Sequence, residues 1–240
     1  MGIENLLYFV LLSVIAEIIG TVGGFGSSLL FVPLAGFFLD FHSVLGITAL
    51  FHLASNISKI TLFRNGFDKK LILNIGIPSV LFVIVGAYLS KLFDSRLLEM
   101  ILAIFLISIS SILLVFKKFV LKPTLVNSIS GGALSGLTAG LLGTGGAIRG
   151  LTLAAFNLKM EIFIATSAII DLGIDLSRSV VYFANGYMHK HDMYLVPILI
   201  GVGFIGTYIG KLILRQFSEQ QFKSVVLILI FVVGIITFTK

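Results

Sequence analysis

The sequence has no cysteine and no tryptophan, and it has few charged residues for its length. Without cysteine, the chain cannot form disulfides, thiolate metal sites or a cysteine nucleophile. Charged residues make up 12% of the 240 residues, about half of their usual share in a soluble globular domain. Because 58% of the residues are hydrophobic and the mean hydropathy is +1.12, the sequence predicts an integral membrane protein with lipid as its solvent.

The net charge of +6 is small for a chain of this length. We attribute it to lysines and arginines in cytoplasmic loops and expect no nucleic-acid partner. The N-terminal stretch MGIENLLYFVLLSVIAEIIG lacks both a basic region and a small-residue cleavage site. It is therefore expected to stay in the protein as a membrane segment, not to act as a signal peptide.

The chain matches itself when it is shifted by about half its length. Three matches recur in the same order: Gly20, Gly23 and Gly26 fall on Gly140, Gly143 and Gly146, FRNG (63–66) falls on FANG (183–186), and GAYLSKL (86–92) falls on GTYIGKL (206–212). This self-similarity predicts two transmembrane repeats, residues 1–122 and 123–240, that together form one transport domain.

Each repeat contains five apolar segments, which predicts an all-α polytopic membrane protein. The segments cover roughly 5–22, 25–40, 42–63, 71–93 and 97–116 in the first repeat, and 125–143, 147–159, 161–183, 194–214 and 222–238 in the second. The first two segments of each repeat are short and are joined by a glycine-rich break. They form either short, tilted spans or a re-entrant hairpin.

Both alternatives give each repeat an odd number of spans, so the two repeats are expected to have inverted topology. The distribution of basic residues agrees with this topology and predicts that both termini are extracytoplasmic. One side collects Arg64, Lys69, Lys70, Lys117, Lys118, Lys122, Lys159, Lys211, Arg215 and Lys223, and the other collects Lys91, Arg96, Lys190 and Lys240.

Six ionisable residues lie inside apolar segments, where they are costly unless they are paired, reach the interface or line a wet cavity. They are Lys59, Arg149, Arg178, Glu17, Asp171 and Asp175. Helical spacing places Thr48, His52, Ser55 and Lys59 on one face, and Ser167, Asp171, Ile174 and Arg178 on the corresponding face of the second repeat, with Asn56 matched by Asp175. We predict that these two faces meet across a central cavity. Alternatively, the cations reach the interface, or Asp175 and Arg178 only neutralise each other.

The stretch GLLGTGGAIRGLTL (140–153) combines a glycine-rich break with a buried arginine. A helix that starts at the break presents free N–H groups and the positive end of its dipole, and Arg149 adds a planar guanidinium suited to oxyanions. We therefore predict an anion site at this break. In the alternative interpretation, the glycines permit close helix packing and Arg149 pairs with Glu17 or Asp171.

Other polar residues allow fewer conclusions. Glu17 is either a proton-coupling group, since burial favours a neutral carboxyl, or a structural partner for a cation. His189 and His191 flank Lys190 in a loop, where solvated histidines are common, and we expect no metal and no cofactor. The sequence has no Ser-His-Asp order, HExxH, P-loop or nucleotide fingerprint, so we do not expect an enzyme.

The chain resembles the sulfite exporter (TauE/SafE) family of membrane transporters. The resemblance rests on GGFGSSLLFVPL (23–34), GITAL (46–50), RNGFD (64–68), GAYLSKL (86–92), GLLGTGGAI (140–148), ATSA (165–168), ANGYM (184–188) and GTYIGKLI (206–213). This resemblance implies secondary transport of small sulfur-containing anions, usually outward, across a prokaryotic inner membrane.

We therefore interpret the protein as a secondary transporter of small anions such as sulfite or sulfonates, with alternating access and proton or cation coupling. The predicted substrate-binding residues are Arg149, Arg178, Lys59, Gly23, Gly24, Gly145, Gly146 and Ser27, and the coupling candidates are Glu17, His52, Asp171 and Asp175. The alternatives are an anion channel and a non-transporting membrane assembly factor. The expected partners are the anion and the lipid bilayer, and a homodimer is left open.

Overall fold

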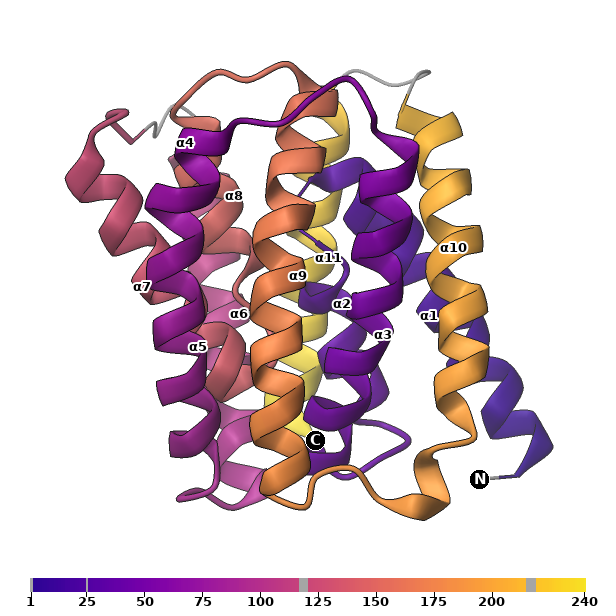
Figure 1. Ribbon diagram of the computed structural model, residues 1–240. Coiled ribbons are helices and arrows are strands. Elements are labelled where there is room, and N and C mark those ends of the chain that lie inside the picture. Colours follow the sequence, from indigo (N-terminus) through magenta and orange to yellow (C-terminus); the bar gives the residue numbers. More distant parts are fainter. Residues whose placement is uncertain (1, 25, 117–120, 215–218) are drawn as a thin grey trace.

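The computed structural model describes residues 2–24, 26–116, 121–214 and 219–240, with the backbone alone for 219–223. All regular structure in these residues is helical (Figure 1). The first half contains α1 (Ile3–Gly23), α2 (Ser28–Ala35), α3 (Phe41–Leu62), α4 (Lys69–Leu71), η1 (Ile72–Gly76), α5 (Ile77–Ser90) and α6 (Ser95–Val115). The second contains α7 (Leu125–Leu142), α8 (Gly146–Ala154), α9 (Met160–Ala184), η2 (Lys190–Asp192), α10 (Leu195–Leu214) and α11 (Glu219–Thr239). Each of the ten predicted apolar segments contains a helix, which confirms the all-α polytopic prediction.

Side-chain caps set the starts of several long helices. The side chain of Asp40 accepts a hydrogen bond from the Ser43 N–H at 3.1 Å at the start of α3. Asp94 caps α6 and Thr124 caps α7 in the same way. Each cap satisfies a backbone donor that has no partner within the first turn of the helix.

Within the described residues, five helices are long and apolar enough to cross a membrane by length and composition: α1, the continuous helix 69–90, α6, α7 and α10. Helices α3 and α9 have 22 and 25 residues, and they carry most of the ionisable residues singled out above. Helices α2 and α8 have only 8 and 9 residues. At 1.5 Å per residue, each is about 12–14 Å long, less than half of a bilayer core of about 30 Å.

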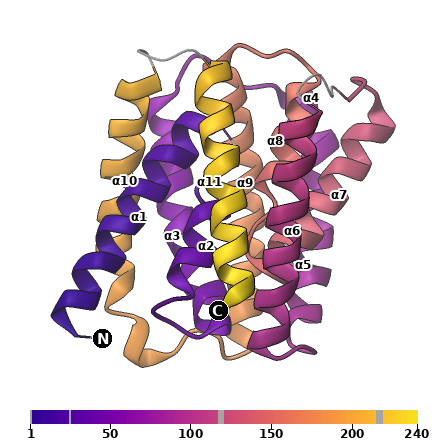
Figure 2. The ribbon, with the colours of Figure 1, turned by 180° about the vertical axis from the view of Figure 1, so that it is seen from behind.

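The helices pack in corresponding pairs. Helices α3 and α9 lie against each other, with α10 beside α3 and α5 beside α9 (Figure 1). Helix α1 packs on α10, and α7 packs on α5. Helices α6 and α11 pack on each other on the side of the bundle that faces away from the viewer in Figure 1. Figure 2, seen from behind, shows this pair in front. The first long helix of each predicted repeat thus packs on the third long helix of the other.

Two matched glycines allow close contacts in the α5–α7 and α1–α10 pairs. A Cβ on Gly86 of α5 would lie 2.3 Å from the carbonyl oxygen of Leu137 in α7. A Cβ on Gly206 of α10 would lie 2.8 Å from the Cβ of Glu17 in α1. Both distances are too short for a side chain, so glycine is required at each position. The repeated GAYLSKL and GTYIGKL motifs therefore have a packing role, as small residues have in other membrane helices.

At both breaks, the helix ends at a glycine with a left-handed backbone conformation. Helix α1 is followed by Gly24 with φ of 70°, and α7 is followed by Gly143 with φ of 76°. Both are left-handed conformations that end a helix and favour glycine. The sequence alignment pairs Gly23 with Gly143, whereas the structure pairs Gly24 with Gly143, because α1 continues through Gly23. The alignment is therefore one residue out of register at this point.

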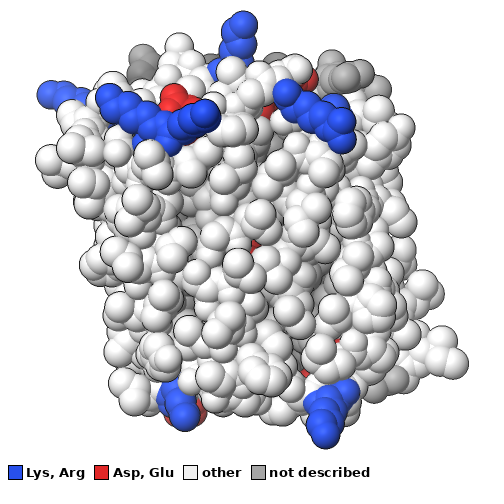
Figure 3. Space-filling model, viewed as in Figure 1, with Lys and Arg blue, Asp and Glu red and all other residues white. Residues whose placement is uncertain are grey.

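Basic residues gather at one end of the molecule. In the view of Figure 3, lysines and arginines concentrate at the upper end, a smaller number lie at the lower end, and no lysine or arginine is visible in the band between them. The chain ends marked N and C in Figure 1 both lie at the lower end. Among the residues predicted for the basic side, Lys117, Lys118, Arg215 and the side chain of Lys223 lie outside the described residues.

Candidate functional site

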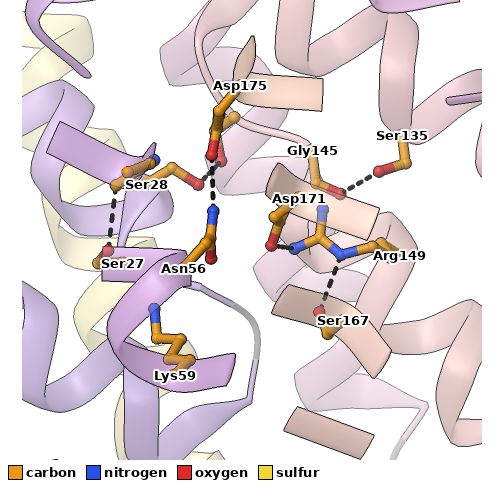
Figure 4. A network of polar contacts seen from close by, with 12 residues as sticks. Ser27, Ser28, Asn56, Lys59, Ser135, Gly145, Arg149, Ser167, Asp171 and Asp175 are labelled. Atoms are coloured by element: carbon orange, nitrogen blue, oxygen red, sulfur yellow. Dashed lines mark hydrogen bonds and ion pairs between the residues drawn. The ribbon is translucent and has the colours of Figure 1, made fainter. Parts of the chain in front are cut away.

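The polar faces of α3 and α9 meet inside the bundle, as the helical spacing predicted. The Asn56 Nδ2 of α3 donates to the Asp175 Oδ2 of α9 at 2.7 Å (Figure 4). His52, Lys59 and Arg178 lie on the same facing surfaces and are all buried. The structure thus brings polar residues from both predicted repeats into one network.

Each buried cation is paired with an acid. The Lys59 Nζ lies 2.9 Å from the Glu17 Oε1, and an Arg178 Nη2 lies 2.7 Å from the Asp175 Oδ1. The guanidinium of Arg149 pairs with Asp171 and donates from Nε to the Ser167 Oγ at 3.0 Å (Figure 4). Asp171 is one of the two partners that the sequence left open for Arg149. Three cations and three acids balance, so the network has no net formal charge when His52 is neutral.

Glu17 is the most fully bonded of the three acids. It is fully buried, and its carboxylate contacts five donors. They are Thr21 Oγ1 at 3.2 Å, Ser27 Oγ at 2.6 Å, Ser55 Oγ at 2.6 Å, Thr207 Oγ1 at 3.0 Å and Lys59 Nζ at 2.9 Å. Ser27 contacts Oε2 and the other four contact Oε1, so both oxygens have partners, which is the arrangement that makes a buried charge tolerable.

Arg178 closes the end of α7 in addition to binding Asp175. Its Nη1 donates to the carbonyl oxygens of Ala139 at 3.1 Å and Gly143 at 2.8 Å. The hydroxyl of Tyr182, one turn further along α9, donates to the Gly140 carbonyl at 2.6 Å. These contacts satisfy carbonyls that a helix leaves without partners at its C-terminus, where a cation also complements the dipole.

His52 connects the two halves of the network. Its Nδ1 lies 3.3 Å from an Arg178 Nη2, and its Nε2 lies 3.0 Å from the Ser27 Oγ. A guanidinium only donates, so Nδ1 is the acceptor and we assign the ring proton to Nε2. Ser27 then accepts from His52 and donates to Glu17. A continuous hydrogen-bonded chain therefore runs from Arg178 to Glu17.

Two adjoining cavities lie between the breaks. The first is small, with a volume of about 20 Å³, and is lined by Gly26, Ser27, Ser28, His52, Asn56, Lys59, Ala139, Gly143, Gly145, Gly146, Asp171, Ile174, Asp175 and Arg178. The second also has a volume of about 20 Å³ and is lined by Gly20, Thr21, Gly24, Gly26, Asn56, Lys59, Ile164, Ser167, Ala168 and Asp171. Gly26, Asn56, Lys59 and Asp171 line both cavities.

The predicted site residues lie at different distances from these cavities. Of the predicted binding residues, Lys59, Arg178, Ser27, Gly24, Gly145 and Gly146 line one cavity or both. Gly23 and Arg149 are absent from the lining, and so is the coupling candidate Glu17. Arg149 is nevertheless close to the lining residue Gly26, since a Cβ on Gly26 would be 3.7 Å from the Arg149 Nη2. Its partner Asp171 has a side chain that is 19% exposed.

The starts of α2 and α8 both line the first cavity, and neither has a side-chain cap. In α8, the first helical hydrogen bond runs from the Arg149 N–H to the Gly145 carbonyl at 3.1 Å. The N–H groups before Arg149 therefore have no acceptor within the helix. Helices α3, α6 and α7 have side-chain caps, whereas α1 and α9 start without one. The starts of α2 and α8 differ from those of α1 and α9 because they line a cavity inside the bundle.

Sequence reasoning missed two contacts of the site. The Thr144 Oγ1 donates to the Ser28 Oγ at 3.0 Å, which joins the two breaks directly. Thr207 of α10 reaches Glu17, and its only sequence signal is its place in the GTYIGKL motif. Hydroxyls are common in membrane helices, so neither residue stands out without the fold.

A scan against protein-family models matches residues 9–237 to the sulfite exporter TauE/SafE family. A search of curated proteins gives no significant match. The family match covers nearly the whole chain, including both breaks and the polar network. The chain belongs to the TauE/SafE family of sulfite exporters, and it is accordingly a multi-pass membrane protein of a transporter family.

Proposed function

We propose that the protein is a secondary transporter that exports small sulfur-containing or organic anions, such as sulfite or sulfonates. The observation that carries this proposal is the pair of uncapped helix starts, those of α2 and α8, at one buried cavity. A helix N-terminus offers N–H donors and the positive end of a dipole to an anion. Lys59 and Arg178 add two cations to the same lining. In this proposal Gly24, Gly145, Gly146 and Ser27 let the anion approach the backbone, and Gly23 only positions the break.

The charge balance of the network supports proton coupling. Three cations and three acids are paired, so a bound anion leaves one uncompensated negative charge in a low-dielectric site. Such a charge is expensive, and a proton that enters with the anion removes the cost. We assign this proton to Asp171, which lines both cavities and is more exposed than the other two acids.

Protonation of Asp171 releases Arg149. The guanidinium then exchanges the carboxylate of Asp171 for the oxygens of the anion, which its planar fork can bind through two parallel hydrogen bonds. The short separation between Gly26 and Arg149 supports this exchange, because Gly26 lines both cavities and a Cβ on it would lie 3.7 Å from the Arg149 Nη2. Glu17, His52 and Asp175 hold the surrounding network in place, and the chain through His52 links the two ends of the site.

We propose that residues 1–122 and 123–240 are two inverted repeats whose α1–α2 and α7–α8 pairs are re-entrant hairpins. The short α2 and α8, the matched helix packing and the left-handed glycines at both breaks support this proposal. Transport would then alternate access by moving one hairpin against the other. The concentration of basic residues at the upper end of Figure 3 supports a cytoplasmic assignment for that end and extracytoplasmic termini. The family match supports residence in a prokaryotic inner membrane.

The test is counterflow in liposomes that contain the purified protein. We expect saturable flux of sulfite, thiosulfate, sulfate, sulfoacetate or taurine, with a dependence on the proton gradient. The decisive variant is Arg149→Met combined with Asp171→Asn, which removes one ion pair and keeps the charge balance. We expect it to fold and to lose flux, and normal flux in this variant would show that the pair is only structural.

The complete internal pairing of the three cations also favours a second candidate, a membrane assembly factor without transport activity. That candidate predicts no flux of any anion and no stabilisation of the folded protein by anions. An anion channel would share the polar lining, but it would not move an anion against its gradient. Uphill flux driven by protons separates the transporter from both.

A further inference from the structure

A cluster of two histidines and a buried aspartate lies in the loop between α9 and α10. The Asp192 Oδ2 is 3.9 Å from the His189 Nδ1 and 3.4 Å from the His191 Nε2. The two imidazole rings stack, with centroids 5.4 Å apart and planes 7° from parallel. One ligand atom from each of the three residues lies within 4.8 Å of the others. The short helix η2 holds this spacing, since the Asp192 N–H donates to the His189 carbonyl at 3.0 Å.

Asp192 shows that this cluster is incomplete. The residue is only 5% exposed, and its Oδ2 has no hydrogen-bond partner among the described residues. Leaving a buried carboxylate oxygen unsatisfied costs free energy that folding does not recover elsewhere. The Asp192 Oδ2 lies near a ring nitrogen of each imidazole. A single cation between these three atoms would therefore give the Asp192 Oδ2 a partner.

A fourth candidate ligand, an oxygen of Asp40, lies near His189. The Asp40 Oδ2 is 4.0 Å from the His189 Nδ1, while the Asp40 Oδ1 caps α3 through Ser43. The Ser43 Oγ lies 2.7 Å from the same His189 Nδ1, a contact that a metal would replace. Ligands of tetrahedral zinc at 2.0–2.1 Å are separated by about 3.3 Å. Three pairs of ligand atoms are 3.4–4.0 Å apart, and those of His189, His191 and Asp192 all lie within 4.8 Å of one another, so binding requires the ligand side chains to move inward.

We propose that His189, His191, Asp192 and Asp40 form a binding site for a divalent transition metal, with Zn²⁺ as the best match. Imidazole and carboxylate ligands in this number suit Zn²⁺ more than Mg²⁺ or Ca²⁺, which prefer oxygen alone. The bound ion would join the α9–α10 loop to the start of α3, and so connect segments from the two predicted repeats. The site lies away from the central cavities and is independent of the proposed anion.

The test is calorimetric titration of Zn²⁺ into purified protein from which any histidine tag has been removed. We expect about one ion per chain, confirmed by Co²⁺ substitution, since tetrahedral and octahedral Co²⁺ differ in their visible spectra. In His191→Ala we expect zinc affinity to fall roughly 10–100-fold or more, by comparison with the loss of a supporting residue. The His191 side chain is 76% exposed, so this variant should fold normally. Asp192→Asn, which keeps the side-chain shape, should weaken binding as well.

His42→Gln is the matched control. His42 lies near the same end of α3 and contacts the Ser95 Oγ at 3.2 Å through Nδ1, but it belongs to no ligand cluster among the described residues. We expect this variant to bind zinc as the wild type does. Absence of saturable zinc binding by the wild-type protein would overturn the proposal, and so would unchanged affinity in His191→Ala.

Discussion

The substitution Asp171→Asn tests the proposed coupling most directly. Asp171 lines both cavities, pairs with Arg149 and accepts a hydrogen bond from no other described residue. In the proposed mechanism, it is ionised when the site is empty and protonated when the anion is bound. Asparagine is neutral at every pH and resembles the protonated acid in shape. The variant should therefore bind the anion without taking up a proton.

The expected change of anion affinity with pH follows from the charge count of the network. If one proton binds with each anion, the apparent affinity of the wild-type protein falls tenfold for each unit by which pH rises, which is about 1.4 kcal/mol per unit. Anion affinity should be higher at low pH, because low pH supplies the protonated form of Asp171 that binds the anion. Between pH 6 and pH 8 the dissociation constant should thus rise by about 100-fold in the wild type. In Asp171→Asn it should stay constant, at the low-pH value of the wild type.

The assay is calorimetric binding of methanesulfonate to the purified protein over this pH range. Methanesulfonate keeps a single negative charge over this pH range, so any change of its affinity with pH must come from groups of the protein. Asp175→Asn is the matched control, since Asp175 lies one turn further along α9 and is bonded to Asn56 and Arg178. We expect Asp175→Asn to keep the pH dependence of anion affinity seen in the wild type, although its folded state should be less stable. A slope of zero in the wild type, or a full slope in Asp171→Asn, would refute the reasoning.

Three further predictions concern packing and motion. Arg178→Gln leaves Asp175 without its cation and removes the side chain that caps the C-terminus of α7. The free energy of unfolding, measured by denaturant unfolding in detergent, should fall by about 3–5 kcal/mol. A loss near zero would contradict the capping role. Gly206→Ala places a Cβ against α1, and the resulting overpacking should cost about 1–3 kcal/mol in the same assay. A Ser28→Cys and Thr144→Cys pair, whose native hydroxyls lie 3.0 Å apart, should cross-link on oxidation and stop flux until it is reduced. Full flux in the cross-linked protein would exclude movement between the two breaks.

The elements of the fold were predictable because lipid imposes a simple rule. A segment that crosses or enters the membrane must be apolar and helical, so hydropathy alone located ten segments. The polar stripe was predictable for the same reason. His52 and Lys59 in one repeat and Asp171 and Arg178 in the other interrupt apolar helices at helical spacing, and few arrangements hide such residues except against each other.

The pairing of the charges was not predictable, since it depends on helix rotation and depth. Glu17 and Asp171 were equal candidates for Arg149. In the structure Lys59 takes Glu17, across 42 positions of sequence, and leaves Asp171 to Arg149. The role of Arg178 at the end of α7 was likewise hidden, because it needs carbonyls that only the break exposes. The one-residue shift at Gly24 arises from the length of α1, which no residue in the motif encodes.

The way the three acids are bonded helps to distinguish a transport site from a purely structural network. A network that only stabilises the fold would satisfy its members alike, because each unsatisfied buried charge costs free energy. Here Glu17 contacts five donors and is fully buried, whereas Asp171 has one ion-pair partner, is partly exposed and faces both cavities. The least bonded acid thus lines both cavities, beside a cation that lies near the lining residue Gly26. This asymmetry fits the proposed mechanism, in which two ion pairs hold the network in place and the third separates when an anion and a proton enter together.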